Sequence, residues 1–166
     1  MFNFHPTAWD KFFLETAIAA TGPSKDPNTQ VGAVIVGADN AIRSTGTNGF
    51  PRGIADLPER LANREAKLEL MVHAELNAII NAARIRVSTR GCTLYLAATD
   101  HTRHIWGGPP CTRCTVHIIQ AGISRVVTFP QKKNSKWAAD LNRARALLIE
   151  AGVELIEVNY NHGGRR

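Results

Sequence analysis

The sequence has 166 residues, of which 44% are hydrophobic and 20% are charged, and this composition is ordinary for a soluble globular protein. The length suits one domain with its own core, no apolar run approaches the roughly 20 residues of a membrane span, and three cysteines do not make a disulfide framework. The net charge of +6 suits an anionic partner such as a nucleotide or a nucleic acid.

The first expected helix covers residues 7–21. Thr7 can cap it, and Asp10 three residues later completes a capping box. Asp10 and Lys11 also fall where a secretory signal needs an apolar core, so we expect a cytoplasmic protein.

Residues 30–37 form a β-branched run typical of a buried strand, and residues 41–49 form its antiparallel partner. Residues 59–71 have helical composition and lead into a helix expected to end near Arg86. Strands and helices then alternate: strands at 91–98, 123–129 and 153–158, and helices at 111–120 and 136–151. This order predicts one α/β domain over residues 1–166, with three α/β/α layers, a mixed five-stranded sheet and helices on both faces.

The segment VHAELNAI, residues 72–79, places a histidine and a glutamate two positions apart at the start of a helix. Positions i and i+2 of a helix point in nearly opposite directions. His73 and Glu75 can therefore act together only if both reach past the N-terminus of the helix, toward a common target.

The segment GGPPCTRC, residues 107–114, offers such a target. Cys111 and Cys114 are three positions apart and therefore neighbours on a helix, and Pro110 suits the entry of that helix. Two thiolates and the imidazole of His73 suit zinc. Three protein ligands leave the fourth position open to water, as in catalytic zinc sites, and Glu75 would carry the proton.

Other interpretations of these residues stay open. His73 and Glu75 could be an ordinary helix-start pair, with the CTRC segment as a redox or structural motif. A fourth protein ligand could also close the metal site, supplied by one of three histidines: His101, His104 or His117. The third cysteine, Cys92, falls within an expected strand, and we expect it to be a buried core thiol.

Together, H-x-E and P-C-x-x-C form the signature of zinc deaminases. The sequence resembles the cytidine and deoxycytidylate deaminase superfamily, and within it the deoxycytidylate (dCMP) deaminases. Six segments carry the resemblance: SKDPNTQVGAVIV (24–36), GTNGFPRG (46–53), HAELNAI (73–79), GCTLY (91–95), PCTRC (110–114) and IIQAGI (118–123). Transfer RNA adenosine deaminases share the two metal motifs but generally lack the FPRG-containing segment.

The resemblance implies a cytidine-deaminase-like fold and the hydrolytic deamination of dCMP to dUMP, with release of ammonia. It also implies one zinc ion (Zn²⁺) per subunit, held by His73, Cys111 and Cys114, with Glu75 as general acid and base. Relatives form dimers or hexamers, so a homo-oligomer is expected.

The resemblance also implies the substrate contacts. The backbone N–H of Ala74 would hold the base carbonyl, Asn28 would hydrogen-bond the sugar, and Lys25 would face the phosphate. Relatives often have G-Y-N-G where this chain has G-T-N-G at 46–49. In allosteric relatives this segment helps bind a deoxynucleoside triphosphate, so Asn48 and Gly49 are candidate effector-binding residues, although Thr47 replaces the aromatic ring that would stack.

The loop at residues 99–110 is longer than in relatives and leads into the metal motif. We expect it to border the pocket, with Trp106 stacking on a base and Arg103 meeting a phosphate. Because of this loop, the substrate alternatives are dCMP, a 5-substituted dCMP, dCTP or a free nucleoside.

Two other functions compete with a small-nucleotide deaminase. The positive charge is compatible with a deaminase acting on tRNA or a single strand, although nucleic acid is the less expected partner; such an enzyme would bind it in a salt-sensitive way. A nucleotide-sensing module stabilised by zinc, without chemistry, would require a closed metal site.

Overall fold

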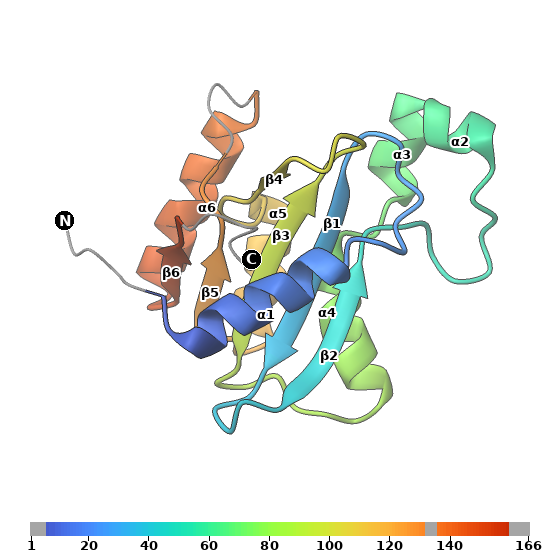
Figure 1. Cartoon of the computed structure of the whole chain (residues 1–166). Coiled ribbons are helices and arrows are strands. Elements are labelled where there is room, and N and C mark those ends of the chain that lie inside the picture. The colour runs from blue at the N-terminus through green and yellow to red at the C-terminus, as the bar shows by residue number, and fades with distance from the viewer. Residues whose placement is uncertain (1–5, 132–135, 160–166) are drawn as a thin grey trace, which may run out of the picture.

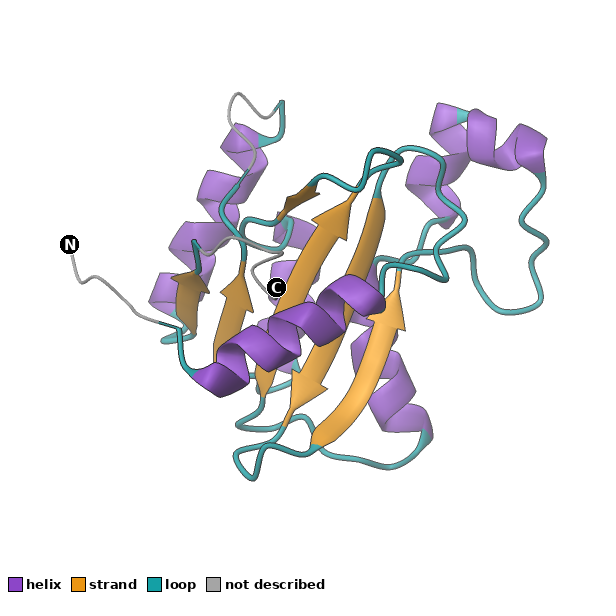
Figure 2. Ribbon diagram, viewed as in Figure 1, coloured by secondary structure: helices purple, strands orange, loops and turns teal. Residues whose placement is uncertain are grey.

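The computed structural model describes residues 6–131 and 136–159, while the single-domain prediction also includes residues outside these ranges. The helices are α1 (Ala8–Ala19), α2 (Pro58–Ala62), α3 (Arg64–Leu70), α4 (Ala74–Arg84), α5 (Thr112–Gln120) and α6 (Ala138–Glu150). The strands are β1 (Gln30–Val36), β2 (Ile42–Thr47), β3 (Thr93–Thr99), β4 (Ile105–Trp106), β5 (Arg125–Thr128) and β6 (Glu154–Glu157) (Figures 1 and 2).

The strands form one mixed sheet in the order β2-β1-β3-β5-β6. β1 is antiparallel to both β2 and β3, whereas β3, β5 and β6 run parallel to one another. The five strands of this order are those expected from the sequence, so the mixed sheet is confirmed. β4 is an addition: its two residues pair with Ala98 and Thr99 of β3.

The sheet is covered on both faces, as predicted (Figure 1). Helix α1 lies across one face, where Phe13 and Leu14 pack against Val34, Tyr95 and other alternate strand residues. Helices α4, α5 and α6 cover the opposite face. There Ile35, Leu94 and other strand residues that point to this face pack with Ile118 and the other buried side chains of these helices. Within the described residues, no helix is long and apolar enough to cross a membrane.

Two glycines let helices pack directly on the strands. A Cβ at Gly46 in β2 would collide with the backbone of Ala74 and Ala78, so α4 rests against this strand without an intervening side chain. A Cβ at Gly32 in β1 would collide in the same way with the carbonyl oxygen of Ala17 in α1. The first contact matters for function because it sets the position of the N-terminus of α4.

Asp10 joins the start of α1 to the sheet. Thr7 and Asp10 form the predicted capping box: the Asp10 N–H donates to Thr7 Oγ1 and the Thr7 N–H donates to Asp10 Oδ2, each at 3.0 Å. Asp10 is only 1% exposed, and its Oδ1 accepts hydrogen bonds from the Tyr95 hydroxyl and from Arg125, each at 3.0 Å. This buried carboxylate therefore ties α1 to β3 and β5.

The helical stretch expected over residues 59–71 is two helices, α2 and α3, and the helix expected to start beside His73 is α4. Asn63 is extended (φ −79°, ψ 112°) and its side chain accepts a hydrogen bond from the Ala66 N–H, so it ends α2 and caps α3. Val72 pairs with Gly49 through two backbone hydrogen bonds of 2.9 and 3.1 Å, which breaks the helix before His73. Local capping and a long-range bridge thus override helical composition.

Candidate active site

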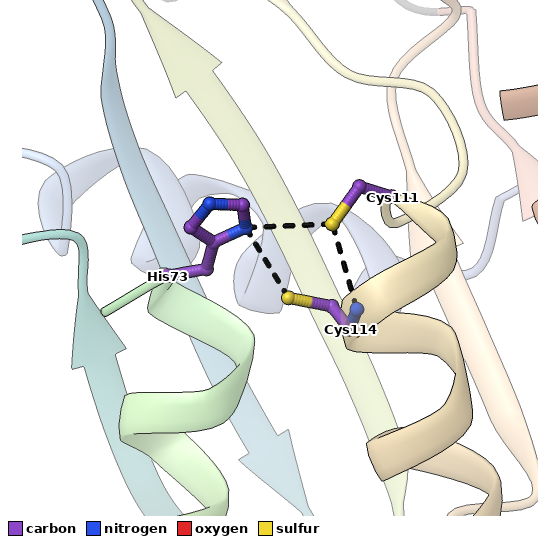
Figure 3. A group of neighbouring side chains, drawn as sticks. All are labelled: His73, Cys111 and Cys114. Carbon is purple, nitrogen blue, oxygen red and sulfur yellow. Dashed lines mark hydrogen bonds between the residues drawn. The ribbon is translucent and has the colours of Figure 1, made fainter. Parts of the chain in front are cut away.

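Two helix N-termini meet over the sheet and bring His73, Cys111 and Cys114 together. His73 is the N-cap residue of α4 and Cys111 is that of α5, both with extended backbone, while Cys114 lies in the first turn of α5. His73 Nδ1 lies 3.4 Å from Cys111 Sγ and 3.3 Å from Cys114 Sγ (Figure 3). The convergence expected from the sequence is therefore present.

These three side chains fit a zinc ion. Their ligand atoms all lie within 4.8 Å of one another. In a tetrahedral site with Zn–S near 2.3 Å and Zn–N near 2.05 Å, sulfur and nitrogen are about 3.6 Å apart, close to the separations found. Among the residues that the structure describes, the group consists of these three alone, and His101, His104 and His117 are not part of it.

The cluster favours a thiolate. The hydrogen bonding between Cys111 and Cys114, assisted by His73 and opposed by burial, lowers the pKa of the Cys111 thiol to about 4. The same hydrogen bonding, together with burial, raises the pKa of Cys114. The hydrogen bond to Cys111 also raises the pKa of His73. Both helix N-termini point their positive ends at this group, which further favours anionic sulfur.

Glu75 lies in the first turn of α4 and is only 5% exposed. Burial raises the pKa of its carboxyl group, while the nearby His73 partly opposes this shift. A carboxyl group with a raised pKa beside three metal ligands is suited to accept and return a proton. The structure thus places Glu75 where the sequence expected a proton carrier.

Two cavities lie near this end of the sheet. A cavity of about 160 Å³ adjoins the cluster, and its lining includes His73, Cys114 and Arg113. A larger one of about 560 Å³ is lined by Thr99, Ile105, Arg103 and others. Alternation along β3 puts Thr99 on the same face as Tyr95 and Ala97, which pack against α1. The larger cavity is therefore on the sheet face opposite the cluster, whereas two of the three cluster residues, His73 and Cys114, line the smaller one.

The expected residues of the 99–110 loop lie on different faces of the sheet. Trp106 pairs with Ala98, which shares the cluster's face with Leu96, whereas Ile105 pairs with Thr99 on the α1 face. The Trp106 ring stacks on that of His104, with centroids 5.9 Å apart. Arg103 has a left-handed backbone (φ 60°) and lines the larger cavity.

The other expected substrate and effector residues have these locations. Ala74 is the first residue of α4, beside the cluster, while Lys25 and Asn28 are exposed on the loop before β1. Asn48 is buried, and its side chain accepts from the Val31 N–H at 2.7 Å and donates to the Thr29 carbonyl at 2.9 Å. Gly49 pairs with Val72, next to His73.

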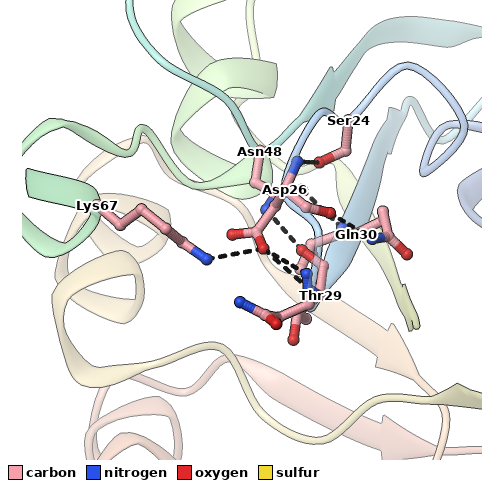
Figure 4. Close-up of polar contacts among 8 residues, drawn as sticks. Ser24, Asp26, Thr29, Gln30, Asn48 and Lys67 are labelled. Carbon is pink, nitrogen blue, oxygen red and sulfur yellow. Dashed lines mark hydrogen bonds and ion pairs between the residues drawn. The ribbon is translucent and has the colours of Figure 1, made fainter. Parts of the chain in front are cut away.

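One contact near the site was not anticipated. The ammonium group of Lys67 in α3 lies 2.8 Å from Asp26, in the loop that carries Asn28 (Figure 4). The two residues are 41 positions apart, and no local pattern pairs them.

The comparisons with known proteins agree with this geometry. Residues 7–129 match the family described as "Cytidine and deoxycytidylate deaminase zinc-binding region". Human deoxycytidylate deaminase is 37% identical over 150 residues, covering 87% of this chain and 76% of the human protein. An uncharacterized deaminase of Aliivibrio fischeri is 37% identical over 149 residues, covering 89% of this chain and 91% of that protein.

A solved structure supports the fold. The cyanophage S-TIM5 dCMP deaminase, crystallised with dCMP and dUMP, superposes with a TM-score of 0.70 at 23% identity, covering 93% of this chain and all of that one. At 23% identity, this similarity supports the fold alone. The matched family, the curated relatives and the convergence of His73, Cys111 and Cys114 agree: this chain belongs to the cytidine and deoxycytidylate deaminase family of zinc-binding enzymes.

Proposed function

We propose that this protein catalyses the zinc-dependent hydrolytic deamination of dCMP to dUMP. The observation that carries the proposal is the meeting of His73, Cys111 and Cys114 at two helix N-termini, with a buried carboxyl group, Glu75, in the first turn of α4. The curated relatives named deoxycytidylate deaminase support dCMP as the substrate, since they match most of this chain.

His73, Cys111 and Cys114 would hold the zinc ion. When bound, zinc supplies Lewis-acid activation of a water molecule. Glu75 accepts a proton as the water oxygen bonds to C4 of cytosine, and returns a proton as the C4–N4 bond breaks. The balance is dCMP plus water giving dUMP plus ammonia, so Glu75 ends in its starting protonation state.

The substrate contacts belong to the same proposal. Ala74 offers its backbone N–H to the base carbonyl at the start of α4, where the helix leaves such groups without intrahelical partners. Asn28 binds the sugar and Lys25 faces the phosphate. Trp106 stacks on the base from the face that it shares with the cluster, and Arg103 reaches a phosphate from the α1 side of the sheet.

Four further features complete the proposal. The chain acts as a single deaminase domain over residues 1–166, it works in the cytoplasm, and it assembles as a homo-oligomer, either a dimer or a hexamer. Asn48 and Gly49 form part of an effector site, where Thr47 offers no ring for stacking.

A substrate panel tests the proposal. The protein, loaded with zinc, is incubated with dCMP, a 5-substituted dCMP, dCTP, CMP and deoxycytidine, and ammonia release is measured for each. The greatest kcat/KM is expected for dCMP. Release of ammonia from none of these compounds would refute deamination, and a clear preference for another member would reassign the substrate.

The net charge of +6 favours one alternative, a deaminase acting on tRNA or single-stranded nucleic acid. This alternative predicts binding that weakens steeply as salt rises, because released counterions dominate such affinities. A filter-binding titration at low and moderate salt decides the matter, and absence of retention at low salt removes the alternative.

A further inference from the structure

A largely buried ion pair connects α3 to the loop that precedes β1. Lys67 Nζ lies 2.8 Å from Asp26 Oδ1, and the two side chains are 16% and 8% exposed, respectively. An ion pair shielded from water is screened less by salt than a surface pair, and removal of one partner leaves the other charge buried.

Asp26 organises the loop that carries Asn28. The same Oδ1 atom accepts hydrogen bonds from the backbone N–H of Asn28 at 2.8 Å and of Thr29 at 3.2 Å. The Asp26 N–H in turn donates to Ser24 Oγ at 3.3 Å (Figure 4). One carboxylate oxygen thus holds two consecutive amides, a local arrangement that defines a turn, and Lys67 supplies the charge that faces it.

A second set of contacts links the far end of this loop to the metal cluster. The Asn48 side chain binds the backbone of Thr29 and Val31, while the backbone of the next residue, Gly49, pairs with Val72, which directly precedes His73. The loop is therefore held at Asp26 by Lys67 of α3, and at Thr29 by Asn48, whose neighbour Gly49 pairs next to the metal cluster.

Helices α2 and α3 project beyond the end of the sheet (Figure 1). Besides the Gly49–Val72 bridge, two side chains attach residues 50–72, which include these helices, to the rest of the protein. Arg52 donates a hydrogen bond to Asn81 Oδ1 of α4 at 2.6 Å, and Lys67 donates to Asp26. Arg52 thus reaches a scaffold helix, whereas Lys67 reaches the loop that carries a proposed substrate residue.

We infer that Lys67 is a positioning residue for the nucleotide: through Asp26 it holds the loop 24–30, and with it Asn28, in the geometry that binds the sugar. The inference rests on the proposed function and extends it to a residue of α3. Lys67 does not touch the reacting atoms, so its loss affects substrate binding and leaves the proton transfers of Glu75 intact.

The experiment compares Lys67→Met, which keeps the length of the stem and removes the charge, with Lys67→Arg, which retains a cation. Arg64→Met, an exposed position on the same helix, is the matched control. Steady-state kinetics on dCMP and the hydrogen exchange of the Asn28 and Thr29 amides are measured for each. Zinc content and melting temperature show whether the variants are folded.

We expect Lys67→Met to raise KM for dCMP by about tenfold and to keep kcat within about threefold, the signature of lost binding rather than lost chemistry. In Lys67→Met the Asn28 and Thr29 amides should exchange faster than in wild type. Lys67→Arg should have a KM close to that of wild type, and Arg64→Met should behave as wild type. Asp26→Asn, which keeps an oxygen for both amides, raises KM similarly, and the double variant is less than additive.

Unchanged KM in Lys67→Met, a fall in kcat alone, or an equal effect of Arg64→Met would each overturn the inference. If wild-type protein deaminates dCMP while Lys67→Met has a normal KM, the positioning role fails and the proposed function stands. If wild-type protein releases no ammonia from any cytosine compound, the proposed function fails, and the role of Lys67 in binding this substrate fails with it. Amide exchange then reports whether the ion pair orders the loop.

Discussion

The Nδ1 atom of His73 lies 3.3 Å from the Sγ atom of Cys114, although the two residues are 41 positions apart in the chain. Each belongs to the beginning of a different helix, and both helices pack on the same face of the sheet. A metal ion placed between them would therefore be held by rigid elements, which is the arrangement that catalytic metal sites require.

Replacement of either metal-motif cysteine should remove zinc. Cys111→Ser and Cys114→Ser each delete one of three protein ligands, and we expect zinc affinity to fall by more than about 100-fold, since loss of outer-shell partners alone costs 10- to 100-fold. Metal content after gel filtration checks this. Cys92→Ser is the control: Cys92 is buried under β3 and lies outside the group of three, so this variant should retain zinc.

Removal of the metal should lower both activity and stability. A ligand that binds only the folded state stabilises it by about 2.7 kcal/mol at 100 times its Kd. We expect a chelator to abolish ammonia release and to lower the melting temperature, and added zinc to restore both. A melting temperature unchanged by the chelator, with metal analysis proving its removal, would contradict a zinc site at these helix ends.

Glu75→Gln should keep the metal and lose turnover. The amide is nearly isosteric but cannot carry the proton, so kcat should fall by about 10²- to 10⁴-fold. Zinc content and ammonia release from dCMP are measured together, with Glu65→Gln, exposed on α3, as the control. Retained activity in the Glu75 variant would remove this residue from its role.

Trp106→Ala should weaken nucleotide binding. A base stacked on an aromatic side chain gains about 1 to 3 kcal/mol, so KM for dCMP should rise by about 5- to 150-fold. Thr102→Ala, exposed in the same loop, serves as the control, and Arg103→Ala reports whether the phosphate is reached from the α1 side of the sheet. A Trp106 variant with normal KM would leave that ring as packing for the loop.

The buried carboxylate of Asp10 predicts a pH dependence of stability. Burial raises its pKa, but hydrogen bonds from Arg125 and Thr7 outweigh this, and the net pKa is below the ordinary value of 3.8. A lowered folded-state pKa contributes stability above the unfolded-state pKa, and this contribution is lost as the pH falls through the folded-state value. Asp10→Asn should cost about 2 kcal/mol at neutral pH, the usual size for hydrogen bonds to a charged group.

Urea unfolding of wild type and Asp10→Asn at several pH values checks this prediction. The difference in free energy of unfolding should be constant at neutral pH and should shrink below pH 3.8. Tyr95→Phe, which removes one donor to Asp10 and keeps the charge pair with Arg125, should cost about 1 kcal/mol. A difference that does not change with pH would show that the Asp10 charge does not contribute.

Much of the fold followed from local patterns. The capping box of Thr7 and Asp10, the β-branched run of β1 and the alternation after the hairpin identified α1, the strands and the mixed sheet. The expectation failed where distant contacts decide. The pairing of Val72 with Gly49 separates α3 from the helix whose start at His73 was expected, and β4 has only two residues, too few for an alternating pattern, which form a strand by pairing with β3.

The sequence by itself determined the chemistry of the site, because the spacing of His73 and Glu75 and that of Cys111 and Cys114 are local properties that place these groups at helix starts. Only the tertiary structure decided that the two helix ends meet, that Trp106 and Arg103 lie toward opposite faces, and that Lys67 pairs with Asp26. These relations depend on how the sheet orders its strands and on close helix–strand packing at Gly46, which bring together residues that no local periodicity connects.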